Sequence, residues 1–326
     1  MTGATHASPR PLFTVFTGTR NRAHTLPRVY ESLKLQTLRD FEWLIVDNES
    51  TDGTRELVEG WQQEAGFPIR YLWHANRGKH GSQNRAVGEA HGQLFLTLDS
   101  DDPCAPNALE RFRLHWESIP ADQRERFSGV TSHTLDADGQ IQGTPFPFDP
   151  TDSDSLEIRY RYHVTGEKWG FQRTDVMRQF PLPEIAGYTG LMPSSITWAA
   201  IARNYRMRFV NEALKTWSGD QAGSLSRPEN RLGDAPGAML EAQETINHDL
   251  RWLPRAPRRF YLKAAKFSRS AFHLGIGLPG QAGRLTSWPT RLLWLAALPV
   301  GLVVYLAERF RFARYLPGPA ERNIGR

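Results

Sequence analysis

Short apolar runs alternate with stretches of helical periodicity at the start of the chain. The runs that predict β-strands are 12–16, 41–46, 69–73 and 94–98. Between them, apolar side chains recur three or four positions apart, which is typical of helices, in 21–36, 55–63 and 82–90. Strands that alternate with helices indicate a mostly parallel sheet flanked by helices. We therefore predict an α/β fold of the Rossmann-like kind.

A polar loop follows each predicted strand. The run Asp47–Thr54 after the second strand is rich in turn formers and helix N-cap residues, and Gly78, Lys79 and His80 follow the third strand. The carboxyl ends of parallel strands meet at one edge of a sheet, where α/β proteins bind their ligands. These loops are therefore expected to face one crevice.

The fourth strand ends in three carboxylates, Asp99, Asp101 and Asp102, followed by Pro103. Carboxylates this close repel one another unless a cation or a hydrogen-bonding ligand lies among them. Carboxylate oxygens suit magnesium or manganese, and magnesium usually shares its shell with substrate phosphates. The alternative is an Asp-rich turn in which Asp99 is the N-cap of a helix.

Four polar motifs in this region together resemble family 2 glycosyltransferases of the GT-A fold. They are Thr19–Arg22, Val46–Thr54, Asn76-x-Gly78 with Asn84, and Asp99–Asp102. The resemblance implies a GT-A domain over 1–230, with its nucleotide-sugar-binding half in 11–102 and its acceptor half in 103–230. It also implies hexosyl transfer, with inversion, from a nucleoside diphosphate sugar to a hydroxyl group.

The resemblance assigns candidate substrate-binding residues. Thr19, Asn21 and Asp47 would line the nucleoside pocket, with Asp47 accepting a hydrogen bond from the base. Asp99 would meet the ribose or a metal-bound water, and Asn84 would belong to the same substrate site. A UDP-sugar is the favoured donor, and a glycan or a lipid-linked sugar is the expected acceptor, in polysaccharide or glycolipid synthesis.

A diphosphate leaving group needs positive charge. The resemblance implies that Asp101 ligates a divalent cation, Mn or Mg, which bridges the diphosphate. Lys79 could add a second positive charge. The alternative for Lys79 is a solvated surface charge, and for His80 a structural hydrogen-bonding role.

The acceptor half departs from the family pattern at the general base. Ser194 stands where relatives commonly carry Glu, and no acidic residue lies between Glu184 and Trp198. A serine hydroxyl cannot remove an acceptor proton at neutral pH as a carboxylate can. We predict Glu184 as the catalytic base. The alternatives are Glu167, Asp175, or an acceptor that needs less activation. A non-catalytic nucleotide-sugar-binding or scaffold protein of the same fold is the competing function.

The rest of the acceptor half predicts further elements. The spacing in Asn107–Arg126 predicts a surface helix, and Asp136–Gly139 predicts a hairpin turn. The run Phe146–Ser155 is rich in Pro, Asp and Ser and has little periodicity. We expect it to be a mobile excursion of the chain over the site.

Composition narrows the class of protein. The chain has 326 residues, of which 40% are hydrophobic and 23% charged, as in ordinary globular proteins. Its one cysteine, Cys104, allows no internal disulfide and favours a reducing compartment. The polar start, Met1–Arg10, does not resemble a signal peptide, so we predict a cytoplasmic protein.

The net charge of +5 conceals an uneven distribution. Residues 251–326 hold 14 Lys and Arg against two acidic residues, whereas residues 1–250 hold 26 against 33. The excess positive charge therefore belongs to the C-terminal part. Its basic residues alternate with aliphatic runs and form no base-reading module, so nucleic acid is not expected as a partner.

Two segments of the C-terminal part suggest a membrane surface. After a linker and a helix in 231–257, the basic and amphipathic run Arg258–Leu274 fits either a membrane-surface helix or a helix docked on the domain. Leu292–Ala307 is uncharged for 16 residues, about 24 Å as a helix against a hydrocarbon core of about 30 Å.

The flanks of this uncharged run decide between its possible arrangements. Pro299 and Gly301 are expected to interrupt it, and basic residues flank it on both sides. We expect a re-entrant or surface-lying hairpin, in which Trp288, Trp294 and Tyr305 are interfacial anchors. The alternatives are a buried core helix and a single membrane span. The tail 258–326 would then hold the protein peripherally on the inner face of the cell membrane.

Overall fold

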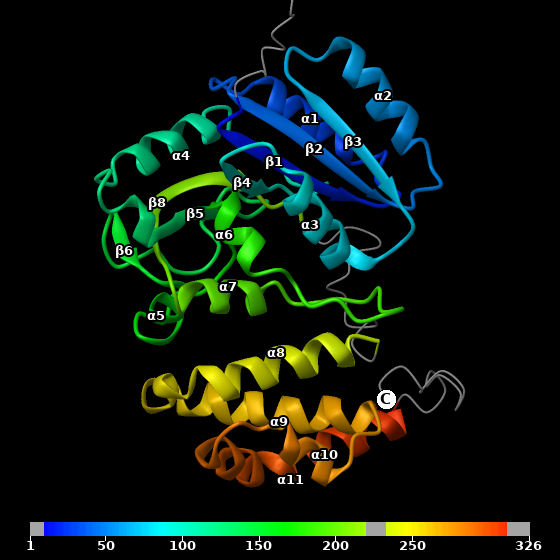
Figure 1. Cartoon of the computed structure of the whole chain (residues 1–326), viewed down its shortest axis with the longest axis vertical. Helices are drawn as coiled ribbons and strands as arrows, with labels where there is room; N and C mark the ends of the chain where they lie inside the picture. The colour runs from blue at the N-terminus through cyan, green and yellow to red at the C-terminus, as the bar shows by residue number, and fades with distance from the viewer. Residues whose placement is uncertain (1–9, 220–232, 312–326) are drawn as a thin grey trace, which may run out of the picture. The chain divides into compact units, whose positions relative to one another are not determined.

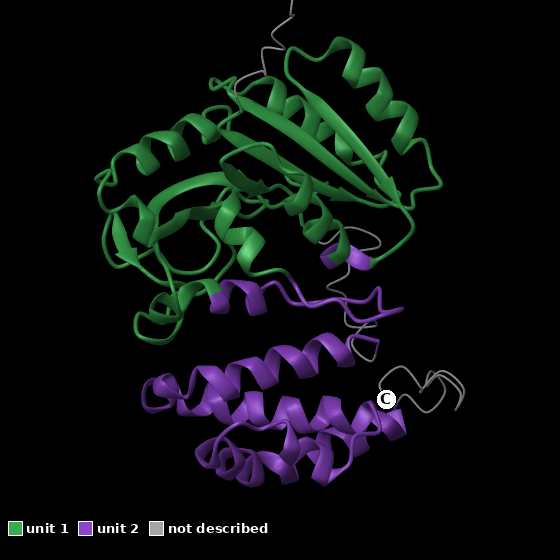
Figure 2. Cartoon of the chain, in the orientation of Figure 1, with its two compact units in different colours: residues 1–77, 81–181, 201–221 green, residues 78–80, 182–200, 222–326 purple. Residues whose placement is uncertain are grey.

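The structure is a computed structural model that describes residues 10–219 and 233–311. The chain divides into two compact units, which we describe separately (Figure 2). The first comprises 1–77, 81–181 and 201–221, and the second comprises 78–80, 182–200 and 222–326. The segment 182–200, which lies in the predicted acceptor half, groups with the C-terminal helices in this division.

In the described part of the chain, eight strands form one mixed sheet in the first unit (Figure 1). The strands are β1 (Phe13–Thr19), β2 (Phe41–Asn48), β3 (Ile69–His74), β4 (Leu94–Thr97), β5 (Phe127–Leu135), β6 (Thr151–Ser153), β7 (Lys168–Arg173) and β8 (Arg206–Thr216). Their order is β3-β2-β1-β4-β7-β5-β8-β6. The pairs among β1 to β4 are parallel, as is β5 with β8, whereas β7 is antiparallel to β4 and β5, and β6 to β8. The predicted mostly parallel sheet is confirmed.

Helices connect these strands. They are α1 (Leu26–Lys34), α2 (Thr54–Glu64), α3 (Gly78–Glu89), α4 (Ala108–Glu117), the 3₁₀ turn η1 (Arg124–Arg126), α5 (Ser155–Tyr160), α6 (Thr174–Gln179) and α7 (Ser195–Ala202). Alternate side chains of β1, β2 and β4 form one apolar core with α1, α2 and α4. In it, Tyr30 stacks on Trp61 and Trp43, so large aromatic rings hold α1 and α2 on the sheet.

Two predicted elements differ from the structure. The helix expected over Asn107–Arg126 ends at Glu117, and Pro120, which has no N–H, follows soon after. The excursion expected over Phe146–Ser155 contains the edge strand β6. The three residues of β6 are polar, and Asp152 forms an ion pair with Arg208 of β8, at 2.7 Å.

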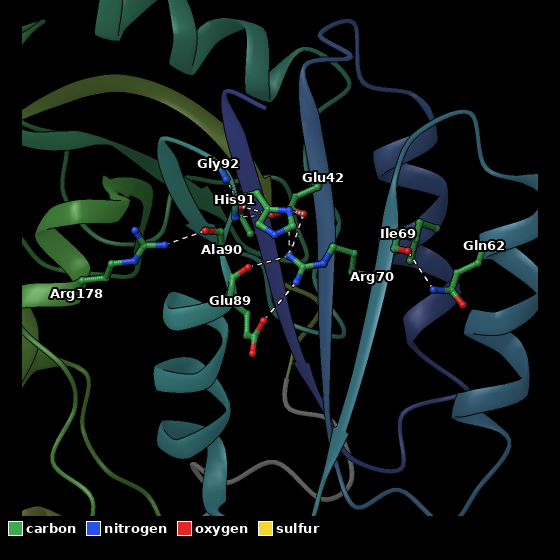
Figure 3. Close-up of polar contacts among 10 residues, drawn as sticks. Glu42, Gln62, Ile69, Arg70, Glu89, Ala90, His91, Gly92 and Arg178 are labelled. Carbon is green, nitrogen blue, oxygen red and sulfur yellow. Dashed lines mark hydrogen bonds and ion pairs between the residues drawn. The ribbon is translucent and has the colours of Figure 1, made fainter. Parts of the chain in front are cut away.

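A buried glutamate joins three strands at the amino edge of the parallel sheet (Figure 3). Glu42 of β2 accepts hydrogen bonds from the Thr14 hydroxyl, at 2.6 Å, and from the His91 backbone N–H, at 2.8 Å. Arg70 of β3 lies 3.2 Å from Glu42 and also donates to the Glu89 carbonyl at the end of α3, at 2.8 Å. This network occupies the edge opposite to the predicted site, so its role is structural.

The second unit consists mainly of helices. In the described residues these are α8 (Ala235–His248), the 3₁₀ turn η3 (Leu250–Arg255), α9 (Pro257–His273), α10 (Leu278–Gly283) and α11 (Trp288–Arg311). Their core includes Ile246 of α8, Phe267 of α9 and Trp294 of α11. A smaller apolar cluster joins Leu182, Met192 and Ile196 of the segment before and within α7.

Helix α9 packs against α8 and α11 inside this unit. Glu241 of α8 is buried and forms ion pairs with Lys263 and Lys266 of α9. Arg269 of α9 lies 2.6 Å from Glu308 of α11. Burial alone would raise the pKa of Glu241, but the two lysines lower it below its usual range. Lys263, Lys266 and Arg269 of α9 thus pair with neighbouring helices.

Helix α11 is continuous over 24 residues, so the interruption and the hairpin that we expected are wrong. Pro299 lies on its exposed side, and packing on α9 offsets the hydrogen bond that the proline removes. By length and composition α11 is able to cross a membrane. Trp294 is buried, with its indole N–H donating to Gln281 at 3.1 Å, so it is a core residue and not the interfacial anchor that we expected.

Candidate functional site

The strand directions bring the predicted polar residues to one edge of the sheet. Strands β1 to β4 run parallel, and β5 and β8 run in the same direction as β4 because β7 is antiparallel to both β4 and β5. Thr19 and Asp47 lie opposite each other at the ends of β1 and β2. Asp99 follows β4, and Glu167 directly precedes β7 at this carboxyl edge.

The loops after β1 and β2 are locked together by Asn21. Its backbone is left-handed, with φ 53°, which Asn tolerates better than most residues. Its N–H donates to the Ser50 hydroxyl at 2.9 Å, and its side-chain oxygen accepts from the Thr51 N–H at 2.8 Å. Asn21 thus joins the two loops through both its backbone and its side chain, where the nucleoside pocket is predicted.

Asp47 is fully buried and already bonded within the protein. One of its oxygens accepts from the Ser50 N–H at 2.7 Å, and the other from the Tyr71 hydroxyl at 2.5 Å. Burial and this hydrogen bond raise the pKa of Tyr71 well above its usual range. The bonds fix the orientation of Asp47, and each oxygen keeps a second lone pair with which to accept from a ligand.

The hydroxyl of Thr19 is a buried polar atom without a hydrogen-bond partner among the described residues. Such atoms are uncommon because an unpaired buried hydroxyl destabilises the folded state. A ligand that supplies the missing partner fits this position.

A buried lysine lies among the carboxylates of the acidic cluster. Oxygen atoms of Asp99, Asp102 and Glu167 lie within 4.8 Å of one another. The ammonium group of Lys215, near the end of β8, is 2.6 Å from Asp102 and 2.5 Å from Glu167. Burial alone would lower the pKa of Lys215, but the three carboxylates outweigh it and raise that pKa above its usual range.

Lys215 supplies positive charge to this acidic cluster from within the chain. The chain brings it close because Ala105 donates to the Leu214 carbonyl at 2.9 Å, and Thr216 donates to the Pro103 carbonyl at 3.0 Å. Lys215 was not among the residues predicted from the sequence. The only available signal was a lysine directly after the run Phe209–Leu214, which was not predicted as a strand.

Asp101 lies next to this cluster but is not one of its three members. Its carbonyl accepts from the Ser218 hydroxyl at 2.6 Å, and Asp102 accepts from the Ser218 N–H at 2.9 Å. The donors available here are carboxylate oxygens, the ligands that magnesium and manganese prefer. The oxygen atoms of these residues are therefore chemically suitable ligands for a divalent cation.

The structure separates the candidates for the general base. Asp175 follows β7, whose last residue, Arg173, pairs with Leu94 at the start of β4. Asp175 thus lies at the amino edge, where it pairs with Arg173 at 2.5 Å. Glu167 lies at the carboxyl edge, and its side chain is 39% exposed.

The remaining predicted residues lie on α3 and in the second unit. Asn84 is half-buried on α3, and Lys79 is exposed in the first turn of that helix. Glu184 and Ser194 are exposed and belong to the second unit, as does Lys79. The roles of all four stay predictions.

Comparisons with known proteins agree with the resemblance. Residues 14–137 match the family model described as Glycosyl transferase family 2. An uncharacterized glycosyltransferase of Nostoc sp. is 35% identical over 119 residues, 36% of this chain and 35% of that protein. The GalNAc(5)-diNAcBac-PP-undecaprenol beta-1,3-glucosyltransferase of Campylobacter jejuni is 30% identical over 101 residues, 30% of this chain and 32% of that protein. The matches thus cover about a third of the length of these relatives.

Solved structures share the fold over nearly the whole chain. S. aureus TarS 1–349 in complex with UDP-GlcNAc has a TM-score of 0.60 at 19% identity, covering 94% of this chain and 93% of that chain. A mannosyltransferase of Pyrobaculum calidifontis in complex with GDP-Man and Mn2+ has a TM-score of 0.51 at 18% identity, covering 93% and 89%. These likenesses confirm the predicted GT-A fold.

Proposed function

Because residues 14–137 are of the family 2 glycosyltransferase type and the chain has a GT-A fold, we propose that this protein transfers a sugar from a nucleoside diphosphate sugar to an acceptor hydroxyl. One observation carries the proposal. Thr19, Asp47 and the carboxylates around Lys215 converge at the carboxyl edge of the sheet, within or beside the matched segment. This edge is where parallel sheets bind nucleotides.

The nucleoside end of the donor is assigned to Thr19, Asn21 and Asp47. The Thr19 hydroxyl has no hydrogen-bond partner among the described residues and can bond to the nucleoside. The oxygens of Asp47, which is held in a fixed orientation, can each accept a further hydrogen bond from it. A UDP-sugar is the favoured donor, since TarS binds UDP-GlcNAc in a related fold, while the mannosyltransferase neighbour binds GDP-Man. As the resemblance implies, we assign Asp99 to the ribose or to a water bound to the metal, and Asn84 to the same substrate site.

Asp101 would hold a divalent cation, which when bound would supply positive charge for the leaving diphosphate. The positive charge of Lys215 compensates the negative charges of Asp102 and Glu167. It therefore weakens the repulsion between these two groups and the carboxylates of Asp99 and Asp101. Lys79 is the second group assigned to the diphosphate. Support for a metal comes from the oxygen donors and from the Mn2+ in the mannosyltransferase neighbour.

Transfer with inversion requires a group that takes the proton of the acceptor hydroxyl. Glu184 is the base that the sequence favours, and Glu167 is the alternative that lies at the same edge as Asp99. The acceptor is proposed to be a glycan or a lipid-linked sugar, since one relative is named for a lipid-linked substrate. Polysaccharide or glycolipid synthesis is the corresponding process.

Calorimetric titration tests the donor assignment. UDP is expected to bind in the presence of Mn2+ and to bind about tenfold or more weakly without the metal or in Asp101→Ala, because the diphosphate loses its counter-charge. The thermal midpoint of Asp101→Ala should stay near that of the wild type. Absence of UDP and GDP binding in both conditions would contradict the proposal.

Donor hydrolysis and transfer separate the two base candidates. With a panel of donors, Glu184→Gln or Glu167→Gln should lower kcat for transfer about a hundredfold or more with little change in UDP affinity. The variant that does so identifies the base, and the other serves as its control.

A non-catalytic nucleotide-sugar-binding protein is the second candidate function. It is favoured by Ser194, which stands in place of the usual carboxylate. Such a protein would bind UDP with Mn2+ but hydrolyse none of the donors. Turnover that disappears in Asp101→Ala would exclude it.

A further inference from the structure

Helix α11 carries an apolar stripe on its exposed side. This outer stripe consists of Trp288, Leu292, Leu295, Leu302, Val303, Leu306 and Phe310. Trp288 is 73% and Phe310 81% exposed, at the two ends of the helix. The buried residues of α11 are Thr290, Trp294, Ala297 and Gly301, three or four positions apart and so on the other face. A continuous exposed apolar surface of this kind marks a binding surface.

Positive charge borders the outer stripe. At about 100° per residue, Arg291 and Arg309 fall beside one edge of the outer stripe. Residues 251–311 contain eleven Lys and Arg and a single acidic residue, Glu308. Glu308 is paired with Arg269, so it does not offset the bordering charge. A partner that is apolar inside and anionic at its surface matches both features, and an anionic lipid bilayer is such a partner.

The inner face of α11 is fixed to its neighbours in the second unit. A Cβ atom at Gly301 would lie 2.7 Å from the Ala265 carbonyl, which shows how closely α11 approaches α9. Glu308 holds Arg269 at 2.6 Å near the end of α11. If α11 crossed a bilayer in this arrangement, it would carry α9 with Lys263 and Lys266 into the hydrocarbon, which is unfavourable.

We propose that the outer stripe of α11 docks this protein on the surface of a bilayer containing anionic lipids, with the helix lying in the plane of the interface. The stripe enters the boundary between head groups and acyl chains, and the bordering arginines contact the lipid phosphates. This docking differs from the hairpin and from the span, and it does not depend on the transferase activity.

Vesicle binding of the full chain tests the proposal. The protein should float with vesicles of phosphatidylcholine and phosphatidylglycerol, and more weakly with phosphatidylcholine alone. Val303→Glu and Phe310→Glu should each weaken binding about tenfold or more, because a carboxylate would enter the apolar boundary beside anionic lipid. Phe148→Glu is the matched control, since Phe148 is 65% exposed in the first unit, and it should bind as the wild type does.

Three further results would overturn the proposal. Unchanged vesicle binding in Val303→Glu would exclude the outer stripe as the docking surface. A dimer of the wild type that becomes a monomer in that variant, without vesicle binding by either, would assign the stripe to a second copy of the chain. Resistance of bound protein to alkaline carbonate extraction would indicate a span. Circular dichroism and thermal midpoints should match the wild type, because the substituted side chains are exposed.

Discussion

Lys215 holds together residues that are far apart in the sequence. It lies 113 positions after Asp102 and 48 after Glu167, and it contacts both carboxylates. Both Lys215 and Asp102 are buried, so each charge depends on the other for compensation. Removing one partner of such a pair leaves a buried charge without a counter-charge, which destabilises a protein more than the pair itself stabilises it.

We predict that Lys215→Met lowers the free energy of unfolding by about 3–5 kcal/mol, because Asp102 is then buried without its cation. Urea unfolding measures the change. The double variant Lys215→Met/Asp102→Asn should recover part of the loss, since it removes the stranded charge. Equal stability of Lys215→Met and the wild type would show that the contact between Lys215 and Asp102 is not formed in solution.

At the scale of elements, the contact of α9 with α11 depends on a glycine. Alanine is favoured over glycine inside a helix by about 1 kcal/mol. At Gly301, however, a Cβ atom would lie 2.7 Å from the Ala265 carbonyl and 2.8 Å from the Ser268 Cβ. A Cβ atom added at Gly60, in the middle of α2, would meet no other atom within 4 Å.

The two glycines should therefore respond in opposite ways to the same substitution. Gly301→Ala is expected to destabilise the protein by about 1–3 kcal/mol through overpacking. Gly60→Ala is expected to stabilise it by about 0.5–1 kcal/mol through helix propensity. Thermal and urea unfolding of both variants measure the difference. A stabilising Gly301→Ala would mean that α11 does not pack on α9 at this distance.

At the scale of the whole molecule, charge is unevenly distributed. The C-terminal part from 251 carries 14 Lys and Arg against two acidic residues, while the rest of the chain is net negative. The fields of exposed charges extend about 10 Å at 0.1 M salt and about 3 Å at 1 M. Electrostatic attraction to an anionic surface should therefore fall with added salt, whereas apolar insertion of the outer stripe should persist.

We predict that binding to anionic vesicles weakens about tenfold or more between low and high salt but does not vanish. Flotation across a sodium chloride series measures this dependence. Binding to vesicles of phosphatidylcholine alone should change little with salt, which provides the control. If binding to anionic vesicles did not depend on salt, the arginines would not contribute to the docking surface.

The sequence by itself determined the local features of this protein. Apolar runs separated by helical spacing predicted β1 to β4 and α1 to α3, because burial of one face imposes a period on each element. Polar motifs placed Thr19, Asp47 and Asp99 at strand ends, and parallel strands then required them to share one edge. Repulsion among the neighbouring carboxylates Asp99, Asp101 and Asp102 predicted a cation at this edge.

Only the tertiary structure decided which elements meet. In the folded chain, Lys215 lies beside Asp102, and the reversed direction of β7 places Asp175 at the amino edge. Helix α9 packs against α8 and α11, whereas the outer stripe of α11 stays exposed. The physical reason is that periodicity shows which face of an element is apolar, but not what covers that face. Pairings between residues a hundred positions apart depend on strand order and direction, which local spacing does not encode.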